Sequence, residues 1–178
     1  MPTPLPTPVP SAQPTNQPSA PPTPLPTFEP GTIVNLAVQP GAEADQSSTC
    51  GGEASLAIDG NTDSNYWNGS VSLTCGDDNG NPDWWWVDLG EGKQHSISTV
   101  SVYNRMENWN GQKSVWYSNV EILDENLNVV DSGYIDVDMN AVITFDFGGV
   151  EGRYVRVQKT TSGYLNIAEV EVMGSSSS

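Results

Sequence analysis

The chain has 178 residues and is strongly acidic, with 22 Asp and Glu against 6 Lys and Arg. A net charge of −16 leaves no cationic surface that would collect phosphates, so we expect no nucleic-acid partner and no attraction to anionic membranes. No apolar run approaches the roughly 18 residues of a membrane-spanning helix, so we expect no membrane insertion.

The first 30 residues differ in composition from the rest, because they hold 12 of the 14 prolines and a single charge, Glu29. Proline at this density excludes helix and sheet and leaves extended polyproline II, at about 3.1 Å per residue. Threonines beside prolines are typical of an O-glycosylated stalk. The expected acceptors are Thr3, Thr7, Thr15, Thr23 and Thr27. Residues 1–30 are therefore predicted to be a stalk or linker, and the serines at 175–178 to begin another.

Residues 31–174 are predicted to form one all-β domain, because short runs rich in Val, Ile, Tyr and Trp alternate with Gly, Asn, Asp and Ser turns. Val100 and Val102 show the period of two of a half-buried strand. Strands that follow one another without helices predict a sandwich or barrel. The expected strands cover 33–39, 84–89, 97–103, 116–123, 129–134, 141–147, 154–159 and 165–173, and only 53–59 is expected to make a helical turn.

The two cysteines, Cys50 and Cys75, are both flanked by turn-forming residues. In a secreted protein we expect one disulfide between two loops, which would close about 25 residues and add about 3 kcal/mol of stability. The alternative is a pair of unremarkable thiols. Two sulfurs and one remote histidine do not make a zinc site.

Seven short motifs are more specific than composition. They are NLA at 35–37, ADQSS at 44–48, AIDGNTDSN at 57–65, WWWVDLG at 84–90, VYNR at 102–105, EGRYV at 151–155 and AEVEV at 168–172. In this order and spacing they resemble the discoidin superfamily (factor 5/8 type C domains), and most closely its fucolectin branch, the F-type lectins. The resemblance covers about residues 32–174. It implies an eight-stranded jelly-roll β-sandwich, glycan binding and a secreted, extracellular protein.

The resemblance also implies a bound calcium ion, Ca²⁺. The family's ligands fall by position on the carbonyl of Leu56, Asp59, the carbonyl of Asn61, Ser70, the carbonyl of Ala168 and Glu169. The residue types agree, since calcium prefers six to eight hard oxygens, many of them carbonyls in tight Gly, Asn and Asp turns. Glu169 stands among apolar neighbours, where a carboxylate needs a partner. The alternative is a solvated acidic turn in which Asp59 and Asn61 cap backbone groups.

The implied sugar site departs from the family pattern. Fucolectins hold their sugar with a histidine and two basic residues, but Leu73 stands at or next to the histidine position. Arg105 matches the first basic residue and Lys113 falls near the second, as a point charge rather than a planar fork. An aromatic plate with amides suits the apolar face and the hydroxyls of a sugar. The predicted carbohydrate-binding residues are Trp67, Asn68, Arg105, Trp109 and Lys113.

Several neighbouring residues carry separate expectations. Asn68 begins a sequon for N-glycosylation, whose use the sequence leaves open. His95 precedes a strand and is expected to be exposed. Trp84 and Trp85 are expected in the core, whereas Trp86 stands where the family is usually polar and is expected to form an exposed apolar patch.

Two functions agree with these observations. The first is a calcium-dependent lectin-like module on a proline-rich stalk. The second is a subunit of an extracellular glycoprotein fibre, in which residues 1–30 dock head-to-tail on another copy of the chain and the altered sugar site serves as the docking surface. No paired carboxylates, nucleophile–histidine grouping or phosphate loop is recognisable, so no enzyme is expected.

Overall fold

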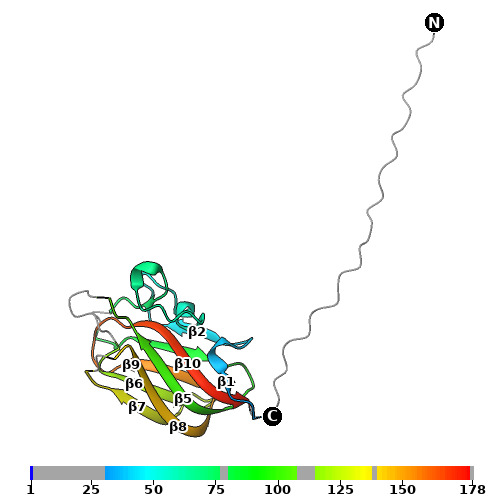
Figure 1. Ribbon diagram of the computed structural model, residues 1–178, viewed down its shortest axis with the longest axis vertical. Helices are drawn as coiled ribbons and strands as arrows, with labels where there is room; N and C mark the ends of the chain where they lie inside the picture. The colour runs from blue at the N-terminus through cyan, green and yellow to red at the C-terminus, as the bar shows by residue number, and fades with distance from the viewer. Residues whose placement is uncertain (2–30, 77–79, 108–114, 138–139, 177–178) are drawn as a thin grey trace.

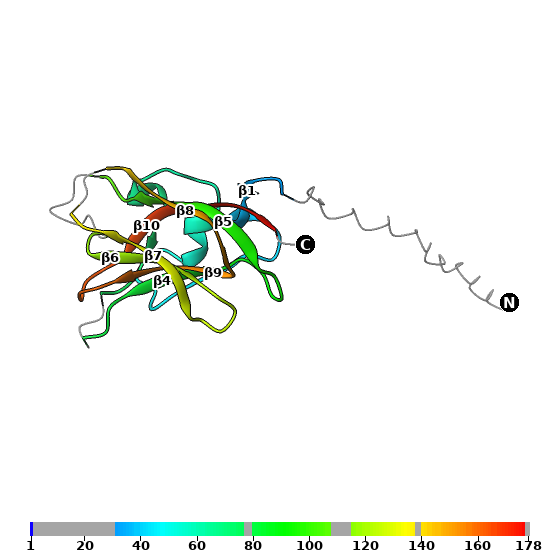
Figure 2. The same cartoon turned by 90° about the horizontal axis from the view of Figure 1, so that it is seen from below.

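A computed structural model describes residues 1, 31–76, 80–107, 115–137 and 140–176. The described residues form ten strands in two antiparallel sheets that pack face to face (Figure 1 and Figure 2). The expectations for the stalk threonines, for Trp109 and for Lys113 fall outside these residues. Within them, no helix is long and apolar enough to cross a bilayer.

The first sheet has the strand order β1-β10-β5-β8, with β3 pairing to β10 as well. Its strands are β1 (Val34–Asn35), β3 (Ser72–Leu73), β5 (His95–Asn104), β8 (Val142–Gly152) and β10 (Asn166–Ser176). The second sheet has the order β2-β4-β9-β6-β7. Its strands are β2 (Glu43–Gln46), β4 (Trp84–Asp88), β6 (Ser118–Leu123), β7 (Val129–Ile135) and β9 (Tyr154–Lys159).

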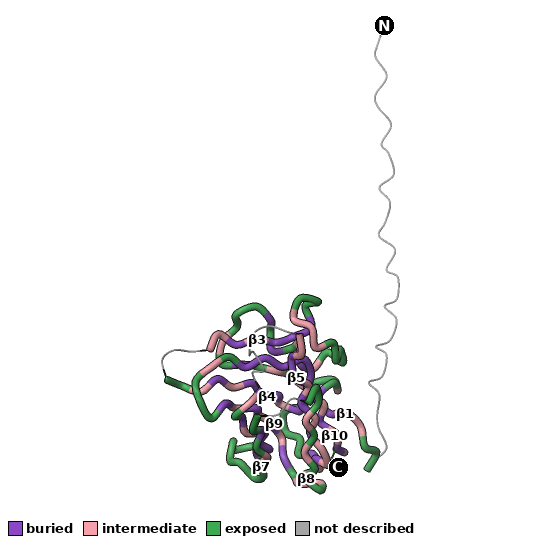
Figure 3. Tube along the Cα trace, turned by 60° about the vertical axis from the view of Figure 1, so that its left-hand side comes forward, coloured by how far each residue is buried: buried purple, intermediate pink, exposed green. Residues whose placement is uncertain are grey.

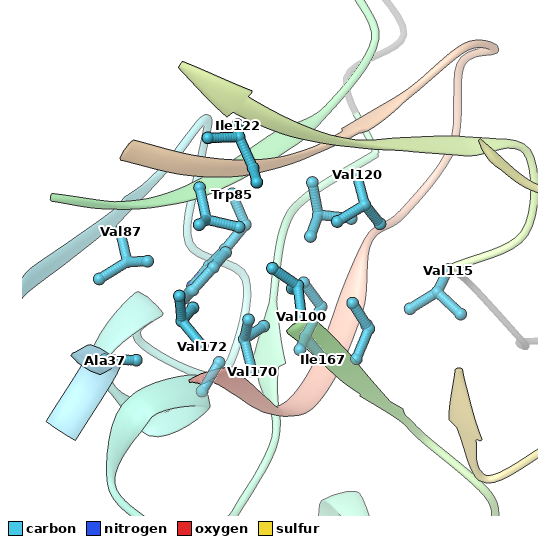
Figure 4. Close-up of a cluster of buried hydrophobic side chains, with 14 of the residues drawn as sticks. Ala37, Trp85, Val87, Val100, Val115, Val120, Ile122, Ile167, Val170 and Val172 are labelled. Carbon is cyan, nitrogen blue, oxygen red and sulfur yellow. The ribbon is translucent and has the colours of Figure 1, made fainter. Parts of the chain in front are cut away.

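The core lies between the sheets and consists of the inward residues of alternating strands. Trp85, Val120 and Ile122 of the second sheet face Val100 and Val172 of the first (Figure 4). The buried indole of Trp85 donates its Nε1–H to the carbonyl of Ala54 at 3.0 Å, so its polar atom is satisfied. Buried residues follow the central strands, and exposed residues gather in the connecting loops and along β7 (Figure 3).

The predicted two-sheet sandwich is confirmed, and each of the eight predicted strands coincides with an observed strand. Two short strands, β2 and β3, escaped prediction because they have four and two residues. The expected strand 33–39 ends early, since Asn35 accepts a hydrogen bond from the Ala37 amide and starts the 3-10 helix η1 (Leu36–Val38). The expected helical turn corresponds to η2 (Ala54–Ile58). At the C-terminal end β10 continues through Ser176, two residues past the expected end of the domain.

Two of the expectations about individual side chains are wrong. Trp84 points away from the core on the outer face of β4 and is only partly buried, because Trp85 takes the inward position of that strand. His95 is not exposed but buried, at 3% exposure, because it begins β5 and its ring contacts the carbonyl of Leu89 through Nε2 at 3.2 Å. Trp86 is partly covered, since it stacks on Tyr154 with 5.0 Å between ring centroids.

The two ends of the sandwich have different contents. At the terminal end, Val34 pairs with Gly174, so the described chain enters and leaves side by side (Figure 1). At the opposite end, called here the loop end, β10 begins at Asn166 beside β3 and the long loop before it. The 11 residues of β10 join the two ends, a length of about 35 Å at the usual rise per residue.

Candidate functional site

The loop between β2 and β3 is organised by its own short polar side chains. Asp59, Asn61, Asp63 and Asn65 each accept, through Oδ1, a hydrogen bond from the backbone amide two residues on, at 2.7 to 3.1 Å. The last of these amides belongs to Trp67. Such Asx turns fix a loop that has no strand partner. The series therefore positions both the acidic turn at Asp59 and the aromatic residue at its end.

Glu169 is the main feature of the acidic side of this loop, and it is fully buried at 0% exposure. Its Oε1 accepts the Gly60 amide at 3.1 Å, but its Oε2 has no hydrogen-bond partner. Burial, together with the nearby charge of Asp59, raises the pKa of Glu169 to about 7. A buried carboxylate oxygen without a partner is costly. A cation placed between Glu169 and Asp59 would remove that cost.

The other predicted calcium ligands come from the segments around Glu169. Leu56 lies in η2, which packs against β10, and Ala168 precedes Glu169 in β10. The Ser70 side chain is buried, and its hydroxyl donates to the carbonyl of Asp63 at 2.5 Å. Among the described residues, no three His, Cys, Asp or Glu side chains are grouped so that they could hold a metal ion, so a cation beside Glu169 and Asp59 would need backbone carbonyls and hydroxyls as further ligands. That donor set suits calcium.

The turn residues also do what the solvated alternative requires of them. Asp59 and Asn61 both cap backbone amides, and Asp63 is exposed. Hydrogen bonds from Asn68 and from the Asn65 amide lower the pKa of Asp63. Capping alone does not explain the unpaired Oε2 of Glu169, and that atom favours the cation.

Trp67 is the most exposed aromatic side chain in the loop, at 66% exposure. It lies in the 3-10 helix η3 (Tyr66–Asn68), which Asn65 caps and which ends at Gly69 in the left-handed conformation, φ +78°. The Tyr66 ring meets Trp67 edge-on, with centroids 5.4 Å apart. Asn68 is exposed beside it and donates to Asp63 at 2.7 Å. The predicted aromatic and amide residues therefore stand together on the surface.

Arg105 lies under this surface rather than on it, at 5% exposure. Its guanidinium binds the carboxylate of Glu107 and donates to Asn166 Oδ1 at 3.1 Å. It also lies over the Tyr66 ring, 4.4 Å from the centroid. Glu107 in turn accepts the Tyr66 amide at 3.2 Å. Arg105 thus fixes the aromatic loop from below.

Sequence reasoning missed Glu107. The available signal was a carboxylate two residues after a candidate sugar-binding arginine, a spacing that allows the two side chains to meet.

Leu73, which is predicted to stand at or next to the family's histidine position, lies at the same surface. A Cβ atom added at Gly51 would fall 2.2 Å from the Tyr66 hydroxyl and 3.5 Å from Leu73 Cδ2, so Leu73 and Tyr66 flank Gly51. Leu73 is held by its carbonyl, which accepts the Cys50 amide at 2.9 Å. Cys50 and Cys75 form a disulfide with 4.9 Å between their Cα atoms. An apolar side chain therefore occupies a firmly held position next to the aromatic pair.

Comparisons with known proteins agree with this arrangement. Residues 56–157 match the model of the F5/F8 type C domain described as NedA-like, galactose-binding. Fucolectin-3 of the eel Anguilla japonica is 35% identical over 151 residues, which cover 78% of each chain.

Two solved structures are similar in fold and sequence. A fucose binding module of Streptococcus pneumoniae is 33% identical with a TM-score of 0.68, covering 78% of this chain and 94% of that one. The lectin domain of lectinolysin, complexed with Lewis B antigen, is 36% identical with a TM-score of 0.68, covering 78% and 95%. The chain belongs to the F5/F8 type C (discoidin) domain family and, within it, to the fucolectin-like members.

Proposed function

We propose that the chain is a carbohydrate-binding, lectin-like module whose sugar surface is formed by Trp67, Tyr66 and Asn68 above Arg105. The observation that carries the proposal is the exposed Trp67, held in place by Asn65 and by the Arg105–Tyr66 stack. An exposed, fixed indole receives the apolar face of a sugar ring, and neighbouring amides bind its hydroxyls. The relatives, by their names, are fucolectins and a fucose binding module.

Membership of the family does not by itself indicate which sugar this module binds. The Leu73 side chain, at or next to the position of the family's histidine, offers no hydrogen bond, so the module is expected to bind fucose-type glycans weakly or to prefer another neutral sugar. No catalytic step is proposed, since a binding role needs no group that reacts.

We also propose that the module is calcium-dependent. The support is the buried Glu169, whose Oε2 is unpaired next to Asp59. The ligands would be Glu169, Asp59 and Ser70 with the carbonyls of Leu56, Asn61 and Ala168. Calcium would supply no chemistry beyond holding the loop that presents Trp67.

The domain is suited to display outside the cell. Its disulfide is typical of oxidising compartments. The chain enters the domain at Gly31, at the terminal end, so a preceding stalk would carry the loop end outermost. Secretion, stalk glycosylation and head-to-tail assembly stay predictions.

The test is glycan-array binding of the full chain and of Trp67→Ala. We expect Trp67→Ala to reduce binding at least about tenfold, equivalent to about 1.4 kcal/mol. Tyr134→Ala is the matched control, because Tyr134 is also an exposed aromatic residue but lies on β7 in the second sheet. Absence of binding to every glycan would overturn the proposed function, and equal binding by Trp67→Ala would exclude this surface.

A further inference from the structure

A hollow lies on the outer face of the second sheet, at the start of β4. It has a volume of about 620 Å³, and its lining includes Ser47, Asn81, Trp84 and Gln158. This volume falls in the range of small-molecule sites, about 300 to 1,000 Å³. Of the predicted sugar-binding residues that the structure describes, none contributes to it, although its lining includes Cys75, two residues after Leu73.

One wall of the hollow is an aromatic side chain held in position. The Trp84 backbone amide donates to Ser47 Oγ at 3.3 Å. The Trp84 ring meets the Trp86 ring edge-on, with 6.0 Å between the ring centroids. Trp86 is itself stacked on Tyr154, with an angle of 8° between the ring planes. The contacts along the row of Trp84, Trp86 and Tyr154 rings hold the Trp84 indole in its position beside the hollow. Among the described residues, the indole Nε1–H of Trp84 has no hydrogen-bond acceptor.

The two side-chain amides of the lining, those of Asn81 and Gln158, are available to a ligand. Gln158 is the direct register partner of Trp84, so both side chains project from the same face of the sheet. The side-chain amides of Gln158 and Asn81 make no hydrogen bond within the described part of the chain. Each amide offers two donors and one acceptor. Ser48 accepts the Cys75 amide at 2.9 Å, which leaves its hydroxyl proton available to a ligand.

The base of the hollow is held by hydrogen bonds, and its one carboxylate is already engaged in them. Asp83 is buried, and its Oδ2 accepts hydrogen bonds from the Thr74 hydroxyl and from the Gly76 amide. Thr74 also accepts the Leu165 amide at 2.8 Å, and the Cys50–Cys75 disulfide closes the rim. Asp83 is the sole ionisable residue in the lining as the structure describes it. The hollow therefore suits an uncharged ligand rich in hydroxyl groups.

We propose that this hollow is a second saccharide-binding site, which takes one neutral pyranose ring. The ring's apolar face packs on Trp84, and its hydroxyls bind the amides of Asn81 and Gln158. The site goes beyond the proposed function, since it shares no binding residue with the Trp67 surface and would stand if that surface bound nothing. With both sites in use, one domain holds two glycan branches or two points of one chain, which raises avidity.

The test is a titration of the ¹⁵N-labelled full chain, followed at the tryptophan indole resonances. Trp84→Phe assigns the Trp84 signal among the six indoles. The probes are the neutral methyl glycosides of fucose, galactose, glucose, mannose and N-acetylglucosamine. We expect at least one of them to shift the Trp84 signal saturably, with an affinity that falls at least about tenfold in Asn81→Ala/Gln158→Ala.

Two control variants separate this site from its surroundings. Asn119→Ala removes an amide from the same sheet face one strand away, at the register partner of Gln158, and should leave the shift unchanged. Trp67→Ala should also leave it unchanged. The proposal is overturned if no probe shifts the Trp84 signal, if the double variant binds as tightly as the original chain, or if Trp67→Ala abolishes the shift.

Discussion

The loop end and the terminal end are made from the same strands, β5 and β10, but their buried polar groups differ. At the terminal end the ring of His95 lies between the Leu89 carbonyl and the Ser176 hydroxyl, with contacts at 3.2 and 3.3 Å. At the loop end, polar atoms of Gln46, Asn104 and Glu169 are buried without partners. Among the described residues, every such unpaired side-chain atom belongs to the loop end.

This difference separates a structural end from a binding end. Folding normally pairs buried polar groups, so an unpaired group needs an explanation such as an ion, a water or a ligand. The loop end also presents the exposed side chain of Trp67. The terminal end is instead closed by the pairing of β1 with β10. The contrast teaches that the strands stabilise both ends, and that the described residues of the loop end leave buried polar atoms for an ion, a water or a ligand to pair.

The largest expected effect concerns what holds the loop end in place. Arg105→Ala removes the guanidinium that binds the Glu107 carboxylate and Asn166 Oδ1 in a nearly buried setting, so we expect a loss of about 3 kcal/mol in the free energy of unfolding. Trp67→Ala removes an exposed side chain and should cost less than about 0.5 kcal/mol. Urea unfolding measures both values. Equal stabilities would show that Arg105 does not support the loop.

The second prediction tests whether the loop end needs a cation. Calcium at about 100 times its dissociation constant should stabilise the chain by about 2.7 kcal/mol, measured as a rise in the thermal midpoint after removal of metal by chelation. Glu169→Gln should abolish this rise. Glu125→Gln removes an exposed carboxylate in the β6–β7 turn and should preserve it. A thermal midpoint that does not change with calcium would contradict the proposed calcium site.

The pattern of apolar residues was sufficient to predict the β-sandwich. Inward positions such as Val100, Val102, Val120 and Ile122 recur at every second residue of their strands, and all four are fully buried. The same pattern gave wrong predictions of burial where contacts between distant strands, rather than neighbouring residues, decide which side chain is covered. Trp84 and Trp85 are chemically identical neighbours, and only the phase of β4 decides which one is buried. His95 looked exposed among polar residues, but pairing with β8 and β10 covers it.

The candidate site shows the same limit. The acidic turn and the exposed Trp67 follow from local sequence, since the Asx turns join residues only two positions apart. The burial of Arg105 does not, because its partner Asn166 lies 61 residues away. The hollow beside Trp84 is lined by residues of β4, of β9 and of the segment directly after β2, and no pattern within one segment indicates it.

The third prediction alters the sugar surface without touching its support. Leu73→His places an imidazole beside Tyr66, at or next to the position where the family pattern has histidine, so that it can donate to a sugar hydroxyl. We expect affinity for methyl α-fucoside to rise about tenfold, or about 1.4 kcal/mol, measured by calorimetry. Leu73→Phe supplies a ring without the hydrogen bond and should give no gain. If the two variants bind alike, Leu73 does not contact the sugar.

The smallest expected effect lies at the terminal end, where acid should act through His95. Burial lowers the pKa of His95, against opposing contributions from the Leu89 carbonyl and the charges of Glu151 and Asp88, while Lys93 lowers it further. The unfolded chain therefore takes up a proton more readily than the folded one. Stability contributed by the neutral ring is complete above the unfolded pKa of about 6.5 and is lost as the pH falls below it.

His95→Gln keeps an amide that can donate to the Leu89 carbonyl but cannot be protonated. Urea unfolding between pH 7 and pH 5 should therefore show a smaller loss of stability in His95→Gln than in the original chain, with each pKa unit of difference worth about 1.4 kcal/mol. Groups at the loop end titrate in both proteins and cancel in the comparison. Parallel pH profiles would mean that the terminal end tolerates a charged His95, and that its closure depends on the pairing of β1 with β10 instead.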